Sequence, residues 1–231
     1  MQSRYLRVYQ WLEIQSLSRY LMLFILAAVF AGCATTAPPE PEPEEDPGVP
    51  LAGGGVVFYL EEGRHGFIIE EKSSMDEETR ELFELAVDRL EAQDYDGAIE
   101  LLETVIGHSP GVTAPYVNIA IVLQKVDRFE EAEEHLKTAL SLVPKHPAAN
   151  NEYGLLLRRM GRFDEARENY EKTLATFPDY HPARRNLGIL CDLYLGDLQC
   201  ALESYETYSE AMPDDDQVEM WIADLRMRLG R

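Results

Sequence analysis

Basic residues and cysteines are both scarce in this chain of 231 residues, which carries 21 Lys and Arg against 42 Asp and Glu. The formal net charge of −21 argues against a nucleic-acid-binding protein, because such proteins need a basic surface that displaces counterions from phosphates. The same charge argues against attachment to an anionic lipid surface through charge alone. With only 3 cysteines, the chain can form neither a disulfide-rich scaffold nor a four-cysteine zinc site.

Motifs for catalysis and metal binding are also missing. The sequence contains no HExxH pair, Walker motif, GxSxG or dinucleotide-binding motif, and its 5 histidines are scattered. Carboxylates are so numerous that two of them near each other say nothing about acid–base catalysis. We therefore expect a protein that is not an enzyme and that requires no cofactor and no metal.

The chain has little apolar sequence of the length that a membrane helix needs. The apolar run from Leu21 to Ala31 is too short for a good span, since a crossing takes about 20 apolar residues. An arginine-containing segment precedes this run and small residues end it, a pattern typical of a signal peptide. We predict that residues 1–32 form this signal peptide.

The signal peptide is followed by a cysteine in the sequence Phe30-Ala31-Gly32-Cys33. This resembles the bacterial lipobox, although that group usually carries Leu where Phe30 stands. The resemblance implies cleavage before Cys33 and a lipid on its thiol. With Ala34 next, it implies a lipoprotein of the outer membrane that faces the periplasm. The alternatives are an ordinary signal peptide with an unrelated cysteine, or a short membrane anchor.

Proline and glutamate dominate residues 33–52, where no basic residue occurs. Such a composition offers too little apolar surface to fold, and proline keeps it extended at about 3.1 Å per residue. We predict a lipid-bearing acidic tether that holds the following domain away from the membrane.

Residues 53–75 contain two short apolar segments, Val56–Leu60 and Phe67–Ile69, on either side of a turn-like sequence. This pattern predicts a short β-hairpin. Because an isolated hairpin is only marginally stable, we expect it to pack either on the following domain or, through its edge, on a partner.

A pattern of small residue, large residue and final proline recurs every 34 residues from Thr79 onward. The positions are Ala98, Leu102, Val105 and Pro110; Ala132, Leu136, Ala139 and Pro144; Ala166, Tyr170, Thr173 and Pro178; and, after a one-residue insertion, Ala201, Tyr205, Tyr208 and Pro213. The pattern resembles the tetratricopeptide repeat, in which small residues let two antiparallel helices approach and proline ends the second helix. The resemblance implies an all-α solenoid of four helix pairs over residues 76–213, with repeats at 79–112, 113–146, 147–180 and 181–213.

One family feature is absent from the repeats. The tryptophan that the family carries near the start of each unit is replaced by Leu82, Tyr116, Asn150 and Arg184. The third and fourth repeats have polar residues there, which leaves their packing in question.

The sequence of residues 214–231 predicts a helix that caps the solenoid. Asp214 to Asp216 suit its N-terminus, and Val218, Ile222 and Leu225 belong to a single apolar stripe. A terminal helix of this kind is expected to present a polar outer face to water.

Cys191 and Cys200 both fall in the fourth repeat, one on its first helix and the other at the start of its second. The short turn between the helices can bring the two side chains together, and the compartment implied by the signal peptide is oxidising. Two alternatives stay open, a disulfide or two buried thiols.

Members of the family bind partner proteins on the concave face that the first helices form. The resemblance places polar residues of three repeats on this face: Asn118, Gln124, Asn151, Arg158, Arg185 and Asn186. An asparagine amide can bond both the N–H and the C=O of an extended peptide, and Arg185 can bind a carboxylate through two hydrogen bonds. The alternative is that these side chains are merely solvated.

Together these features predict a lipid-anchored periplasmic adaptor that helps to assemble or brace an envelope machine such as a pilus, secretion or motility apparatus. The machine is suggested by analogy, since a fold alone does not fix function. The alternatives are a chaperone-like carrier of unfolded peptides and an accessory subunit that positions a separate enzyme.

Overall fold

The computed structural model describes residues 49–50, 56–59, 67–70 and 73–230. The predicted signal peptide at 1–32, the lipid-attachment residue Cys33 and most of the predicted tether lie outside the described residues. Among the residues that are described, no helix is long and apolar enough to cross a membrane.

Three short strands precede the helices. Strands β1 (Val49–Pro50), β2 (Val56–Tyr59) and β3 (Phe67–Glu70) form an antiparallel sheet in the order β1-β2-β3. Strands β2 and β3, paired from Val56 opposite Glu70 to Tyr59 opposite Phe67, lie where the sequence predicts a hairpin. Strand β1 falls within the predicted tether at 33–52, whose composition did not indicate a strand. Proline is tolerated there because β1 is an edge strand.

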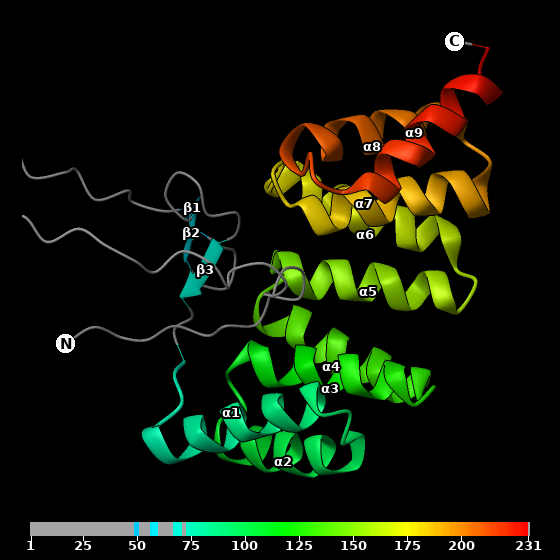
Figure 1. The fold of residues 1–231 in the computed structure, drawn as a ribbon. Helices are drawn as coiled ribbons and strands as arrows, with labels where there is room; N and C mark the ends of the chain where they lie inside the picture. Colours follow the sequence, from blue (N-terminus) through cyan, green and yellow to red (C-terminus); the bar gives the residue numbers. More distant parts are fainter. Residues whose placement is uncertain (1–48, 51–55, 60–66, 71–72, 231) are drawn as a thin grey trace, which may run out of the picture.

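The helical domain contains four antiparallel helix pairs and a ninth helix within residues 73–230 (Figure 1). The pairs are α1 (Glu77–Glu91) with α2 (Tyr95–His108), α3 (Thr113–Lys125) with α4 (Phe129–Leu142), α5 (Pro147–Arg159) with α6 (Phe163–Thr176), and α7 (His181–Leu190) with α8 (Leu198–Ala211). A π-helical segment, Cys191–Leu195, extends α7, and α9 (Asp216–Arg228) follows. The predicted fold, an all-α solenoid of four helix pairs with a capping helix, is confirmed.

The helices form two layers. Each first helix contacts the first helix of the next repeat, α1 with α3, α3 with α5 and α5 with α7. Each second helix packs between its own first helix and the first helix that follows. We call the side of α1, α3, α5 and α7 that is turned away from the second helices the inner face. It is the face that the sequence predicts to be concave.

Local sequence explains the turns within the pairs. One residue per turn has a positive φ, at the equivalent positions Gln93 (60°), Asp127 (58°), Gly161 (77°) and Gly196 (66°). An aspartate then begins the next helix at two of these turns: Asp94 accepts from the N–H of Gly97, and Asp197 from that of Cys200. A left-handed residue that ends one helix and a capping side chain that starts the next give a tight reversal.

Close approach of the paired helices depends on a small residue in the first helix. A Cβ atom added to Gly154 would lie 2.6 Å from Cε1 of Tyr170, and one added to Gly188 would lie 2.4 Å from Cε1 of Tyr205. Both tyrosines are fully buried. In the first two repeats the equivalent pairs are Ala86 with Leu102 and Ala120 with Leu136, which all belong to one buried cluster.

Three of the four residues that replace the family tryptophan make hydrogen bonds to the preceding repeat. The Tyr116 hydroxyl donates to the Pro110 carbonyl, the Asn150 amide to the Pro144 carbonyl and the Arg184 guanidinium to the Pro178 carbonyl, each at 3.1 Å. In each case the acceptor belongs to the proline that ends the preceding repeat. The polar residues of the third and fourth repeats therefore tie successive repeats together.

A charged network also joins the second and third repeats. Glu133 of α4, only 13 % exposed, accepts from Arg162 at 2.8 Å and from the Tyr153 hydroxyl at 2.8 Å, and lies 2.9 Å from Lys137. Burial raises the pKa of Glu133, but the hydrogen bonds from Lys137, Arg162 and Tyr153 outweigh burial and lower the pKa to about 2. The folded state therefore favours the ionised form of this carboxyl group.

We expect Glu133→Gln to lower the free energy of unfolding by about 2 kcal/mol at pH 7, which is the usual contribution of a hydrogen bond to a charged group. Because the pKa in the fold lies below the ordinary 4.5, this stabilisation is present above about pH 4.5 and is lost as the pH falls toward about 2. Urea unfolding at pH 7, 5 and 3 measures it. The control is Glu165→Gln, whose carboxylate is 52 % exposed and should matter by less than about 1 kcal/mol. A pH-independent effect of Glu133→Gln would contradict the prediction.

Candidate protein-binding site

A line of apolar side chains follows the inner face from one repeat to the next. Val87, Ile121, Leu155 and Ile189 occupy equivalent positions, 34 residues apart, on α1, α3, α5 and α7, and each is partly exposed. Sequence reasoning that concentrated on polar residues missed this line, although the repeat period alone would have found it. A stripe of this kind can contact apolar side chains of a partner.

Three of the predicted polar residues lie beside this line and are bonded within the protein. The Asn118 amide donates back to the Ala114 carbonyl of its own helix at 2.9 Å. The Asn186 amide donates to Asn151 Oδ1 at 3.0 Å, and the Asn151 amide donates to Glu152 at 3.2 Å. The structure therefore brings Asn151 and Asn186 together across α5 and α7, whereas Asn118 stands apart in the second repeat.

Gln124 differs from these asparagines because its side chain has no partner. It is 3 % exposed, and neither Nε2 nor Oε1 makes a hydrogen bond in the part of the chain that the structure describes. Its backbone carbonyl accepts from Arg159 of α5 at 2.6 Å, which fixes the end of α3 against the third repeat. A buried amide with unused donor and acceptor destabilises the free protein by about 1–3 kcal/mol. Gln124 is thus suited to bond a peptide group supplied by a partner.

The two predicted arginines already have internal contacts. Arg185 donates to Gln217 of α9 at 3.1 Å, lies 3.5 Å from the Asp215 carboxylate and stacks 5.1 Å above the centre of the Trp221 ring. It links α7 to the capping helix, and its binding of a carboxylate of a partner stays a prediction. Arg158 lies 5.6 Å above the Tyr194 ring centre.

Glu152 is the other distinctive polar group of the inner face. Its carboxylate makes no ion pair among the described residues and accepts only from the Asn151 amide. Burial raises the pKa of Glu152 to about 7, against the opposing effects of Asn151 and of the Lys125 charge. A carboxyl group that is costly to ionise in the free protein would be stabilised by a basic group of a bound partner.

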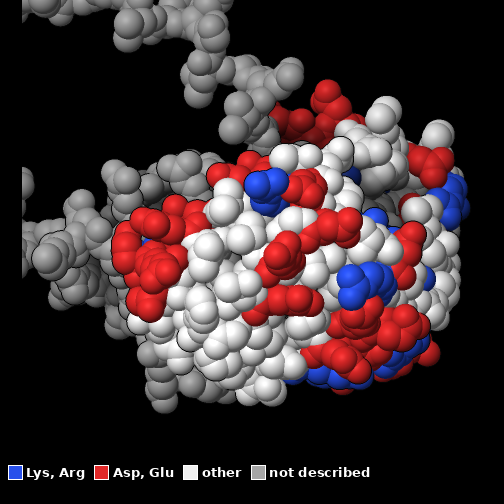
Figure 2. All heavy atoms as spheres, turned by 90° about the horizontal axis from the view of Figure 1, so that it is seen from below, with Lys and Arg blue, Asp and Glu red and all other residues white. Residues whose placement is uncertain are grey.

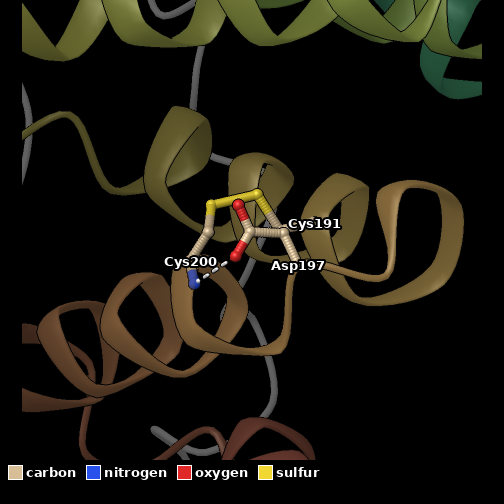
Figure 3. A group of neighbouring side chains, drawn as sticks. All are labelled: Cys191, Asp197 and Cys200. Atoms are coloured by element: carbon tan, nitrogen blue, oxygen red, sulfur yellow. Dashed lines mark hydrogen bonds between the residues drawn. A yellow bond between two sulfur atoms is a disulfide. The ribbon is translucent and has the colours of Figure 1, made fainter.

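The sulfur atoms of Cys191 and Cys200 form a disulfide, with 5.9 Å between the Cα atoms (Figure 3). It connects the π-helical end of α7 to the first turn of α8. Asp197 lies beside it: its carboxylate accepts from the Cys200 N–H at 3.1 Å. Among the described residues, these three form the one group of side chains placed closely enough to hold a metal ion. Because a metal needs free thiolates, the bonded sulfurs leave no metal site here.

The outer surfaces of the described domain carry many charged side chains, but we assign no binding site to them. Figure 2 shows the α1–α2 end of the domain, where acidic side chains outnumber basic ones. A pocket of about 470 Å³ lies between α6, α7 and α8, with both Arg167 and Arg184 and both Glu171 and Glu203 in its lining. Since these charges oppose one another, the pocket does not select a ligand of one sign, and we assign none to it.

Comparisons with known proteins agree with this architecture. The tetratricopeptide repeat profile matches residues 111–178 and 145–214, whereas no curated protein matches the sequence. Among solved structures, PilF of Pseudomonas aeruginosa is 21% identical, with a TM-score of 0.62 over 66% of this chain and 69% of that one. PilW, described as a type IV pilus biogenesis factor, is 25% identical, with a TM-score of 0.61 over 68% and 72%. MamA of Desulfovibrio magneticus RS-1 is 19% identical, with a TM-score of 0.57 over 68% and 88%.

Proposed function

We propose that this chain, which belongs to the tetratricopeptide-repeat family through its helical domain, is a membrane-anchored adaptor that holds a partner protein on its inner face. The anchor is a lipid on Cys33, and the location is the periplasmic side of the bacterial outer membrane. The chain itself catalyses no reaction. Its partner belongs to an envelope machine, for which pilus assembly is the leading candidate.

The buried, unpaired amide of Gln124 is the observation that carries this proposal. It lies one helical turn from Ile121, so the two share the inner side of α3. The apolar line supplies contact area, Gln124 supplies hydrogen bonds to a peptide backbone, and Glu152 favours a basic side chain nearby. An extended partner segment with apolar and basic residues satisfies all three.

Two further observations support the location and the machine. A disulfide at Cys191–Cys200 is typical of an oxidising compartment such as the periplasm, in agreement with the signal peptide and the lipobox-like sequence. The solved structure of PilW, named as a type IV pilus biogenesis factor, is similar over 68% of this chain. That likeness suggests pilus assembly by analogy.

Crosslinking in intact cells, followed by affinity purification and mass spectrometry, tests the proposal. We expect Gln124→Leu to lose the partner while its melting temperature stays unchanged or rises, because leucine removes an unsatisfied buried amide. Glu152→Gln should weaken capture of the same partner. The matched control, Gln199→Leu, changes an exposed residue on α8 and should capture as much partner as the native chain.

The same cells test the anchor and separate the alternatives. Cys33→Ala should move the protein from the membrane fraction to the soluble fraction. One stoichiometric partner supports an adaptor, whereas many unrelated apolar peptides indicate a chaperone-like carrier. Enzyme activity that copurifies indicates an accessory subunit. If Gln124→Leu captures the same partners as the native chain, the inner face is not the binding site.

A further inference from the structure

Helix α9 occupies the place of the first helix of a fifth repeat. Its residue Ala223 lies 35 residues after Gly188, the same offset that separates Tyr170 from Tyr205 across the one-residue insertion. Val218, Ile222 and Leu225 of α9 are buried in the apolar cluster of the third and fourth repeats. Ala223 is therefore the counterpart of the small residue against which a second helix packs in each preceding repeat.

No helix of residues 73–230 covers that side of α9. Ala223 is exposed, and Met220 and Met227 are 65 % and 73 % exposed. The polar outer face predicted for this helix is thus wrong at its centre. In Figure 1, α9 lies at one end of the stacked helices, so a partner can reach it without displacing an element of the domain that the structure describes.

The exposed residues have the spacing of a helix–helix seam. Met220, Ala223 and Met227 follow one another at intervals of three and four residues, which is the a/d spacing of a coiled coil. Residues on the opposite side of α9, such as Ile222 and Leu225, face the domain core. The seam therefore points outward, and the small side chain of Ala223 at its centre permits close approach of a second helix.

Charges beside the seam are complementary to those of a second, antiparallel α9. Asp216 and Glu219 lie in its N-terminal half, and Arg226 and Arg228 in its C-terminal half. A two-fold axis through Ala223 places residue 219 of one copy beside residues 226 and 227 of the other. Glu219 of each copy then lies beside Arg226 of the other copy, so one such pair forms on each side of the axis. A parallel arrangement would instead place Glu219 near the second copy's Asp224, and the like charges would repel.

Internal contacts leave these groups accessible. Arg226 pairs with Glu206 at 2.7 Å yet remains 54 % exposed, and Glu219, which contacts Ser209, is also exposed. Asp224 of each copy lies near Asp224 of the other in this arrangement, but it is paired with Arg228 of its own helix at 3.2 Å. Glu219 and Arg226 thus each find an oppositely charged residue on an identical helix.

We propose that this protein forms a two-fold symmetric dimer through antiparallel contact of two α9 helices, with Met220, Ala223 and Met227 at the interface. An interface of this kind uses the same patch on both copies and closes without further growth. A single helix face buries less area than the standard stable complex, so the dimer is weak and reversible. It leaves both inner faces open, and it does not depend on the proposed function.

Cysteine crosslinking of the full-length protein tests the contact. In Ala223→Cys the introduced thiols face each other across the axis, so mild oxidation should give a dimer on a non-reducing gel. Ala175→Cys is the matched control, since it introduces a thiol at an exposed alanine of α6. If Ala223→Cys gives no more dimer than Ala175→Cys, the proposal fails.

A charge exchange tests the antiparallel arrangement. Sedimentation equilibrium of the full-length protein in detergent should show that Glu219→Arg weakens dimerisation at least tenfold, and that Arg226→Glu does the same. The double variant should return to within about threefold of the native dissociation constant, because the pairs are restored with exchanged signs. Equal melting temperatures of the domain exclude misfolding as the cause. If the native protein is a monomer throughout, or the double variant remains monomeric, the proposed contact is wrong.

Discussion

Gly188→Ala is expected to lower the free energy of unfolding by about 2–3 kcal/mol, even though alanine favours a helix over glycine by about 1 kcal/mol. The new methyl group would lie 2.4 Å from Cε1 of Tyr205, and a ring buried between α7, α8 and α9 has little room to move. Urea unfolding of the full chain, monitored by circular dichroism, measures the change.

The first two repeats indicate how the clash can be relieved. They place alanine where the third and fourth repeats place glycine, and leucine where these place tyrosine. Tyr205→Leu alone should cost about 2–3 kcal/mol through the cavity it leaves. Gly188→Ala combined with Tyr205→Leu reproduces the pair found at Ala86 and Leu102, so we expect it to be no less stable than Tyr205→Leu. In this double-mutant cycle, the coupling energy between positions 188 and 205 is then about 2 kcal/mol.

Gly107→Ala is the matched control for a glycine that has space around it. Gly107 is exposed near the end of α2, and a Cβ atom there would meet no other atom within 4 Å. The substitution should therefore raise the free energy of unfolding by up to about 1 kcal/mol. The prediction fails if Gly107→Ala and Gly188→Ala change the free energy of unfolding in the same direction, or if the effects of Gly188→Ala and Tyr205→Leu simply add. Either result would show that close contact between the helices is not the reason for glycine at position 188.

Removing the disulfide by Cys191→Ala and Cys200→Ala together is expected to lower the free energy of unfolding by about 2–3 kcal/mol. A crosslink that closes a loop of this size limits the unfolded chain by about that amount in the entropic model. The loss should be greatest in the fourth repeat and α9, because the disulfide joins the π-helical end of α7 to α8. Hydrogen exchange of the two variants would locate it.

Chemical reduction provides the control for this prediction. A reductant should destabilise the native chain by the same amount and leave the double cysteine variant unchanged. Cys33, the only other cysteine, is common to both proteins. If reduction alters neither protein, the disulfide does not contribute to stability.

Sequence alone determined the repeat architecture, because the interactions that define a helix pair are local. The 34-residue period sets the length of two helices and two turns, and the small and large residues that recur within it, such as Gly188 and Tyr205, belong to the same pair. Helix ends were also readable, since Asp94 and Asp197 cap the helices they precede and proline ends each repeat. The residues that replace the family tryptophan could not be interpreted in this way.

The tertiary structure decided which polar side chains remain free, since their partners come from neighbouring repeats or the capping helix. Arg185 and Gln124 both looked like ligand-binding residues. Arg185, however, contacts Gln217 and Trp221 of α9, whereas the amide of Gln124 makes no hydrogen bond among the described residues. The stagger between successive helix pairs brings residues 32 to 36 positions apart together, and a sequence period does not specify that stagger. The same reason explains α9: its apolar stripe predicted burial on the fourth repeat, but only the packed helix revealed that Met220 and Met227 are left exposed on the other side.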